Sequence, residues 1–302
     1  MPDRVGEDCE LYIFETKSFF SKKEKSYICG KHLYGNMTKQ ILTTFVSLTF
    51  CLTMSAWGGT EHRLMAYIAE EHLTESTRRF LDRYLDQSIV EYSTWMDRYR
   101  DSPGYEHTTY WHMVTMAADG TFPQDGEGKA LQALNNAIGI LRDYREHDDS
   151  TVFVNLLYVI HLVPEIHCPS HTYYYDLGGP AQAKARDFQR LTFDGKSTTY
   201  HGVWDSSVST LNPGLTYDEY KEKFDTWTPE MQRSISDGTP EDWIRDNASI
   251  CRRIYDWAKP GDSIGIEFLR NHREVPESMV PRAAYRLARV LNDLFDNQNQ
   301  ED

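Results

Sequence analysis

Two pairs of residues in this chain have the spacing of metal ligands. His161 and Glu165 are four residues apart, as are His201 and Asp205, and His171 lies between the two pairs. On a helix, residues four apart lie on one face about one turn from each other, so an imidazole and a carboxylate could bind one ion together. A single such pair is more often a core histidine beside a surface acid. Two pairs with a histidine between them favour a metal site.

The apolar run before His161 is the element expected to position the first pair. Residues 152–160 are mostly apolar, which indicates a buried helix that would carry His161 and Glu165 on one face. Further amphipathic helices are predicted over residues 130–144, 217–224, 240–257 and 276–295, and another helical stripe begins at His62. Strand signals are scarce. The sequence therefore predicts an all-α fold, a single globular multi-helix domain with the metal site in a cleft between helices.

The overall charge limits which partners the chain can bind unaided. Its 302 residues carry a formal net charge of −14, and 40% of them are hydrophobic, which is enough for a sizeable core. Polyanions such as nucleic acids are normally bound by Lys and Arg, so an acidic protein acting on phosphate would need bound cations. Acidity that merely keeps a secreted protein soluble is an equally good interpretation of the charge alone.

The amino-terminal part of the chain changes character at Met37. Residues 1–36 show no periodicity and are interpreted as an upstream extension without function. Residues 37–56 have a short basic start, a twelve-residue apolar stretch and a small residue, Ala56, before the expected cut, which is the pattern of a signal peptide. A membrane anchor is the alternative interpretation. We therefore expect a secreted or periplasmic protein whose functional domain comprises residues 57–302.

Cleavage after Ala56 would free the α-amine of Trp57. An α-amine and the carbonyl oxygen of the same residue can chelate a metal ion, and His62 follows five residues later. Trp57 can equally be a core aromatic at the start of a helix. The exported part keeps Cys168 and Cys251, which could form one disulfide or remain as free buried thiols.

Short motifs along the chain add to the two pairs. In order, they are Trp57-Gly58-x-x-x-His62, Trp95-x-Asp97-x-x-Arg100, Trp111-His112, His161-x-x-x-Glu165-x-x-x-x-x-His171, Gly178-Gly179 and His201-x-x-Trp204-Asp205. Each motif is weak by itself. Their order, their spacing and their position after a signal peptide resemble the S1/P1 nuclease family, and the resemblance runs from Trp57 to about Phe295.

The resemblance implies a centre of three zinc ions. One ion would be bound by Asp97, His112, His161 and Glu165. A neighbouring ion would share Glu165 and be bound also by His62 and by the amine and carbonyl of Trp57. The third would be bound by His171, His201 and Asp205. Nitrogen and oxygen ligands in these numbers suit zinc and leave positions for water and substrate.

The resemblance also implies an activity. A water activated by zinc would attack phosphorus, while Glu165 bridges two of the ions and Arg100 neutralises charge on the phosphate oxygens. The substrates would be single-stranded DNA or RNA, cleaved to 5′-phosphate products, and 3′-nucleotides, cleaved to nucleosides. No stable protein partner is implied, and no membrane anchor remains after the signal peptide is removed. Three divalent cations would explain how an acidic protein acts on a polyanion.

The chain departs from the family pattern at several positions. Glu165 stands where the family usually has Asp. Pro164 stands where Gly is usual, and it is expected to remove a backbone donor and to kink the helix just before Glu165, which the longer side chain could compensate. Met113 and Thr115 stand where family nucleases place base-contacting residues. Stacking on an aromatic residue is worth about 1–3 kcal/mol per base, so its loss would favour mononucleotides or another phosphoester. The tyrosines at 173–175 could provide a replacement.

Two other functions remain open from the sequence. A zinc phospholipase C would share the fold and the plan of ligands, although the spacing from Trp57 to His62 and the final ligand Asp205 favour a nuclease. The second alternative is a metal-binding descendant with impaired catalysis, because Pro164 and the substrate positions are altered.

Overall fold

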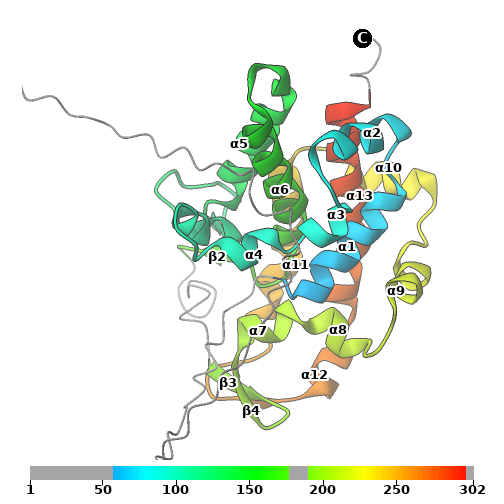
Figure 1. Ribbon diagram of the computed structural model, residues 1–302. Helices are drawn as coiled ribbons and strands as arrows, with labels where there is room; N and C mark the ends of the chain where they lie inside the picture. The colour runs from blue at the N-terminus through cyan, green and yellow to red at the C-terminus, as the bar shows by residue number, and fades with distance from the viewer. Residues whose placement is uncertain (1–56, 177–189, 297–302) are drawn as a thin grey trace, which may run out of the picture. The chain divides into compact units, whose positions relative to one another are not determined.

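The chain is helical through most of its described length. The computed structural model describes residues 57–176 and 190–296 (Figure 1). The α-helices are α1 (Gly59–Glu71), α2 (Glu75–Tyr84), α3 (Ile89–Tyr92), α4 (Trp95–Tyr99), α5 (Ala130–Arg142), α6 (Asp149–Glu165), α7 (Tyr200–Asp205), α8 (Ser207–Leu211), α9 (Tyr217–Phe224), α10 (Pro229–Ser236), α11 (Pro240–Ile254), α12 (Ile266–Asn271) and α13 (Glu274–Phe295). The 3-10 helices are η1 (Glu106–His112) and η2 (Tyr144–Glu146).

Three long helices form the centre of the core. α1, α6 and α13 pack against one another, and α5 packs on α6 (Figure 1). Every residue of α6 from Asn155 to Glu165 is buried, as expected for a helix that is apolar nearly all round. α1 instead buries one stripe, which includes the predicted residues Leu64, Met65, Ile68 and Ala69. The end of α6 that carries the predicted ligands therefore lies inside the core.

Capping residues determine where several helices begin. Asp148 accepts a backbone N–H of the first turn of α6, which satisfies one of the donors that a helix start leaves unpaired. Thr216 and Glu219 form a capping box at the start of α9, and Thr239 and Asp242 form another at the start of α11. These boxes fix the first residues of two helices whose starts the sequence predicted correctly.

The described strands are short, with two to four residues each. β1 (Val114–Met116) pairs in parallel with β2 (Thr172–Tyr174). β3 (Arg190–Phe193) lies between β4 (Lys196–Thr199), which is antiparallel, and β5 (Ser263–Ile264), which is parallel. The turn from β3 to β4 consists of Asp194 and Gly195 with positive φ angles of 46° and 75°, as two-residue hairpins require. β4 leads directly into α7.

The carboxyl end of α6 turns the chain toward the next predicted ligand. Pro164 stands in the last turn and has no N–H group to donate to the preceding turn. The helix nevertheless includes Pro164 and ends one residue later, at Glu165. After Glu165 the backbone forms tight turns with hydrogen bonds between residues three apart. The N–H groups of His167 and Cys168 donate to the carbonyls of Pro164 and Glu165 at 3.0 Å and 3.1 Å. A third such bond, of 3.1 Å, joins His171 N–H to the Cys168 carbonyl. Glu165 and His171 thus stay close to each other.

The predicted fold class is confirmed, because the described residues are mostly helical. The predicted helix over 217–224 coincides with α9, and that over 130–144 corresponds to α5 followed by η2. α11 ends at Ile254, before the predicted end at 257, and α13 begins at Glu274, before the predicted start at 276. In the part of the chain that is described, no helix combines the length and the apolar character needed to cross a membrane.

Some predictions concern residues outside the described ranges. These are the extension at 1–36, the signal peptide at 37–56, the Gly178-Gly179 motif and the tail at 297–302. The division into an extension, a signal peptide and a domain at 57–302 therefore stays a prediction.

Candidate metal centre

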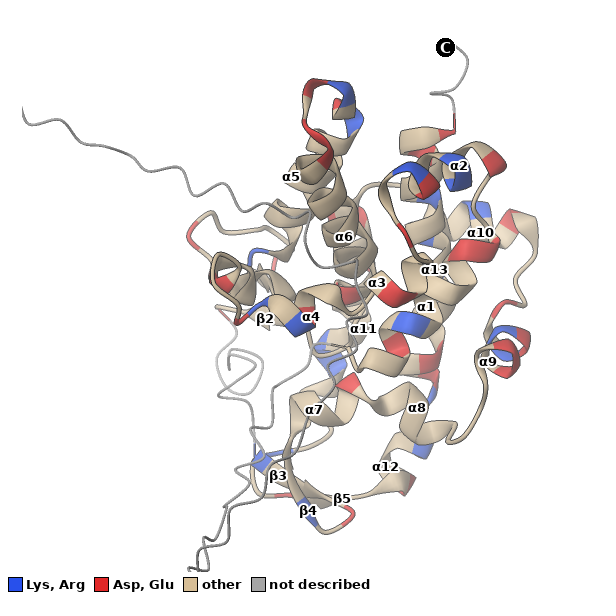
Figure 2. Ribbon diagram, in the orientation of Figure 1, with Lys and Arg blue, Asp and Glu red and all other residues tan. Residues whose placement is uncertain are grey.

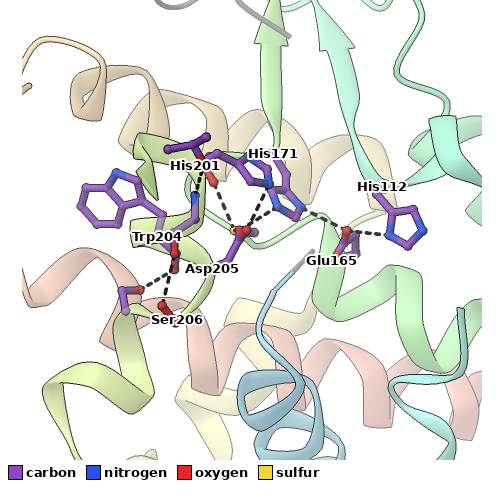
Figure 3. A network of polar contacts seen from close by, with 12 residues as sticks. His112, Glu165, His171, His201, Trp204, Asp205 and Ser206 are labelled. Carbon is purple, nitrogen blue, oxygen red and sulfur yellow. Dashed lines mark hydrogen bonds and ion pairs between the residues drawn. The ribbon is translucent and has the colours of Figure 1, made fainter. Parts of the chain in front are cut away.

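Glu165 lies in the middle of the predicted ligands (Figure 3). Its side chain is fully buried, and it faces imidazoles from four parts of the chain. Its Oε1 atom lies 3.0 Å from His112 Nδ1 and 3.2 Å from His171 Nδ1. Its Oε2 atom lies 3.2 Å from His62 Nε2 and 4.0 Å from His161 Nε2. One carboxylate therefore joins two groups of candidate ligands.

The first group comes from four separate elements. His62 lies in the first turn of α1 and His161 in the last turns of α6, and their rings stack with centroids 4.0 Å apart. His112 ends η1, and its Nδ1 atom lies 3.3 Å from His161 Nε2 and 3.7 Å from Oδ1 of Asp97 in α4. Donor atoms of His62, Asp97 and His161 lie within 4.8 Å of one another, as do those of His112, His161 and Glu165. Two overlapping groups could thus each bind an ion.

The pairing of β1 with β2 explains how His112 and His171 reach the same carboxylate. Val114 pairs with Thr172, and the Val114 N–H donates to the His171 carbonyl at 2.8 Å. Each histidine lies just before a paired strand, and paired strands run about 4.8 Å apart. The two side chains therefore start from neighbouring backbone segments and converge on Glu165.

The second group lies on the other side of Glu165 (Figure 3). Asp205 Oδ1 lies 3.2 Å from His171 Nε2, and Asp205 Oδ2 lies 3.2 Å from His201 Nε2. The two imidazole rings are stacked, with centroids 4.7 Å apart and planes 6° apart. His201 and Asp205 lie one turn apart on α7, as the sequence predicted. The Cys168 sulfur lies 3.5 Å from Asp205 Oδ1 and belongs to the same group.

Gly58 holds the start of the described chain against this second group. Its N–H donates to the Asp205 carbonyl at 2.7 Å, and its own carbonyl accepts the His62 N–H at 3.1 Å. A Cβ atom at Gly58 would lie 3.1 Å from the Asp205 oxygen and 2.4 Å from Oε2 of Glu61. A side chain here would therefore displace the end of Glu61 and crowd the Asp205 backbone, which glycine avoids. Trp57, which is fully buried, is thereby anchored beside Asp205, and the role of its amine and carbonyl stays a prediction.

Burial keeps two of the histidines neutral. It lowers the pKa of His161 well below its usual value, with a further contribution from His62, and it also lowers the pKa of His201. A histidine must be neutral to bind a metal. His161 Nδ1 lies 2.7 Å from the Ser93 carbonyl, so Nδ1 carries the proton and donates it there. The lone pair of His161 then lies on Nε2, which faces the site.

The carboxylates indicate that the site needs positive charge. Burial opposes charge on Glu165, but the neighbouring imidazoles, chiefly His171, outweigh it and hold the pKa of this carboxyl well below its usual value. Burial raises the pKa of Asp205 to about 7 and also raises the pKa of Asp97. Asp97 Oδ1 and His112 Nε2 are buried without a hydrogen-bond partner. Bound cations would stabilise the charged forms of Asp97 and Asp205. They would also provide partners for the unpaired Asp97 Oδ1 and His112 Nε2 atoms.

Arg100 lies at the edge of the first group. It follows the last residue of α4, and its Nη1 atom lies 3.7 Å from Asp97 Oδ1. Its side chain is 12% exposed, whereas those of His62 and His161 are fully buried. A guanidinium offers several N–H donors to phosphate oxygens. Its position therefore suits the predicted role in binding phosphate, which stays a prediction.

The structure brings the side chains of the predicted ligands into one connected network. Its members are His62, Asp97, His112, His161, Glu165, His171, His201 and Asp205. Cys168 was not among the predicted ligands, because the sequence indicated only a disulfide or a free buried thiol at this position. Both Cys168 and Cys251 are buried free thiols. The available signal was the position of Cys168 only three residues before the predicted ligand His171, since cysteine is itself a zinc ligand.

His167, next to the network, has a different role. Its Nδ1 atom donates to the Val163 carbonyl at 2.7 Å, and its Nε2 atom accepts from Arg286 Nη1 at 2.9 Å. Arg286 is fully buried and comes from α13. His167 therefore ties the end of α6 to α13 and does not turn toward Glu165.

Comparison with known proteins agrees with the site. The family model described as S1/P1 Nuclease matches residues 57–296. Nuclease S1 of Aspergillus oryzae is 26% identical over 278 residues, which cover 80% of this chain and 92% of that protein. Endonuclease 5 of Arabidopsis thaliana is 23% identical over 298 residues, which cover 84% of this chain and 94% of that protein. With a match over most of its length, this chain belongs to the S1/P1 nuclease family.

Proposed function

We propose that this chain is an exported, zinc-dependent phosphodiesterase. It cleaves single-stranded nucleic acid to 5′-nucleotides and 3′-nucleotides to nucleosides. The family supports a hydrolytic nuclease, and both relatives are named as nucleases. The observation that carries the proposal is the position of Glu165, one buried carboxylate in contact with imidazoles of two groups. So many ionisable groups in one buried place would destabilise the fold unless cations bind between them.

The donor atoms fit zinc. Neutral imidazoles and carboxylates are ligands that zinc accepts, and burial maintains the neutral form of His161 and His201. We assign one ion to Asp97, His112, His161 and Glu165. We assign a neighbouring ion to Glu165, His62 and the amine and carbonyl of Trp57. The third ion is assigned to His171, His201 and Asp205. In support, donor atoms of His112, His161 and Glu165 lie within 4.8 Å of one another. His62 Nε2 lies 3.2 Å from Glu165 Oε2, and His201 Nε2 lies 3.2 Å from Asp205 Oδ2.

Zinc would also provide charge that the protein lacks. The formal net charge is −14. In the view of Figure 2, Lys and Arg are scattered among Asp and Glu over the helices and do not gather on one element. Attraction of a polyanion therefore depends on cations in the site itself.

The residues of the chain orient the reactants. When bound, zinc supplies Lewis-acid charge for the phosphate and for the water that attacks phosphorus. The Ser93 carbonyl fixes which nitrogen of His161 faces the site, because it accepts the proton on Nδ1. Arg100 neutralises charge on phosphate oxygens as the bond between phosphorus and the 3′-oxygen breaks. The oxygen of the attacking water becomes bonded to phosphorus, and the leaving 3′-oxygen takes up a proton. The phosphate stays on the 5′ side of a cleaved strand, or leaves as free phosphate from a 3′-nucleotide.

The substrate positions favour 3′-nucleotides over long single strands. Thr115 is buried, and its Oγ1 atom accepts the Gly128 N–H at 2.8 Å, so this side chain supports a loop and is not directed at a base. Tyr174 is buried and donates to a backbone carbonyl of α11. Tyr175 is 45% exposed and is the member of the tyrosine run best placed to stack on a base. Weaker stacking lowers the affinity for polynucleotides more than it lowers the rate of hydrolysis at phosphorus.

The test uses protein that begins at Trp57. Elemental analysis should find three zinc ions per chain, and the protein should cleave single-stranded DNA and 3′-AMP but not phosphatidylcholine vesicles. Glu165→Gln keeps the shape of the side chain without its charge, and it should lose zinc and turnover together. Zinc-loaded protein without turnover of any phosphoester would identify a non-catalytic descendant. Release of phosphocholine without cleavage of DNA would identify a phospholipase C.

Export rests on the sequence pattern of residues 37–56. It is tested separately by expressing the chain from Met37 and determining the amino terminus of the secreted product. We expect Trp57 as the first residue, and retention of the uncleaved protein in the membrane would contradict this.

A further inference from the structure

Cys168 lies inside the second group of candidate ligands. Its sulfur is 3.5 Å from Asp205 Oδ1, and the same oxygen lies 3.2 Å from His171 Nε2. One donor atom from each of the three residues lies within 4.8 Å of the others. All three side chains are almost completely buried, with at most 5% of each residue exposed. A thiol is thus held beside the carboxylate and imidazole that the family resemblance assigned to zinc.

The distances match those between ligands of one zinc ion. Zinc binds cysteine sulfur at about 2.3 Å and imidazole nitrogen or carboxylate oxygen at about 2.0–2.1 Å, so two ligands on a tetrahedral ion are about 3.3–3.6 Å apart. The sulfur-to-oxygen distance of 3.5 Å and the nitrogen-to-oxygen distance of 3.2 Å are close to these values. A weak hydrogen bond from the Cys168 thiol would give a similar distance to one oxygen.

A second imidazole at the Asp205 carboxylate, that of His201, distinguishes a metal site from that hydrogen bond. The rings of His171 and His201 are parallel, and their Nε2 atoms lie 3.2 Å from the two oxygens of Asp205. A thiol needs only one acceptor and would not require two imidazoles at the same carboxylate. Sulfur, two nitrogens and an oxygen together form a donor set that selects zinc over magnesium or calcium.

We propose that the Cys168 thiolate is a fourth protein ligand of the zinc ion bound by His171, His201 and Asp205. The proposal rests on the proposed function, because it requires that this group binds zinc. Four protein ligands close a tetrahedral site, whereas catalytic zinc sites keep a position open for water or substrate. Two anionic ligands would also neutralise the charge of this ion. It therefore serves to hold α7 and the loop after α6 together, and the two ions that share Glu165 carry out the chemistry.

Cobalt absorption tests the ligand directly, without reference to activity. Protein beginning at Trp57 is stripped of metal and titrated with Co²⁺ alone, since cobalt adopts zinc geometries and its thiolate bonds absorb in the near ultraviolet. We expect one thiolate-to-cobalt band that saturates with a single equivalent of metal. Cys251→Ser, the matched buried cysteine, should keep the band, and Cys168→Ser should lose it.

X-ray absorption at the zinc edge gives a second measurement that needs no variant, in case Cys168→Ser does not fold. In the native protein, one of the bound zinc ions should have one sulfur ligand at about 2.3 Å. Three bound ions with only nitrogen and oxygen ligands would overturn the proposal and leave the proposed function intact. A chain that binds no zinc or cobalt would overturn both, beginning with the proposed function.

Discussion

Shortening Glu165 to aspartate should weaken the metal centre, although aspartate is the residue usual in the family. The glutamate carboxylate reaches its partners at 3.0 Å for His112 and 3.2 Å for both His171 and His62. It does so from the last turn of a helix that contains Pro164. Glu165→Asp removes one methylene and withdraws the carboxylate by about 1.5 Å, the length of one carbon–carbon bond. A contact straight ahead of the carboxylate would then open by this full amount, to about 4.5–4.7 Å.

Coulomb's law gives the size of the expected loss. We take the 3.2 Å contact to His171 as the distance from the carboxylate to a positive charge. At an effective dielectric constant of about 20, moving unit charges apart from there to about 4.7 Å costs about 1.6 kcal/mol. A divalent ion doubles this cost to about 3 kcal/mol. Since about 1.4 kcal/mol corresponds to a factor of ten, zinc affinity should fall on the order of 100-fold.

Competition with a chelator measures this loss. The zinc dissociation constants of the native protein, Glu165→Asp and Glu165→Gln are compared, together with turnover of 3′-AMP. We expect the aspartate variant to bind zinc on the order of 100-fold more weakly and the glutamine variant to bind more weakly still. Circular dichroism should show native helix content in each. An aspartate variant that binds three ions as tightly as the native protein, with equal turnover, would refute the reasoning from side-chain length.

Three further changes test other parts of the structure. His161→Ala should lose at least one zinc equivalent together with turnover, whereas the exposed His147→Ala should keep both; a fully loaded, active His161→Ala would remove this residue from the ligands. Protein that retains residues before Trp57 should turn over 3′-AMP poorly, because an amide nitrogen cannot chelate as an amine, and equal rates would contradict this. Arg286→Met should cost about 2–4 kcal/mol in urea unfolding of the metal-free protein, because a buried imidazole nitrogen and a carbonyl lose their donor. The more exposed Arg289→Met is the control, and an equal effect of both changes would be evidence against the role of burial.

Helix bounds could be predicted where the sequence marks the ends. α9 and α11 begin directly after the capping threonines Thr216 and Thr239. The predicted start of α13 at 276 is wrong by two residues, because the helix begins at Glu274, before the proline. Pro276 is instead the third residue of α13. Its missing N–H costs nothing there, since the first four N–H groups of a helix have no partner within it.

Parts of the site could not be predicted, because they depend on pairing across the chain. β1 and β2 have three residues each, too few to show an alternating pattern, yet their register places His112 beside His171. The contact of Gly58 with the Asp205 backbone left no signal beyond a glycine. The His and acid pairs were predictable because one helical turn fixes their spacing, and Cys168 lay in the same stretch unrecognised.

The wide separation of these residues along the chain has a consequence for how the molecule matures. Glu165 contacts His62 from 103 positions away, and Gly58 is bonded to the backbone of Asp205 at the end of α7. Contacts between such distant segments form late in folding, and vectorial synthesis delays them further. The nascent chain therefore has no complete metal site until α7 has been synthesised and has packed beside Gly58. Metal binding then coincides with the final packing of the core. The concentration of metal where the chain folds would therefore limit the rate at which active protein forms.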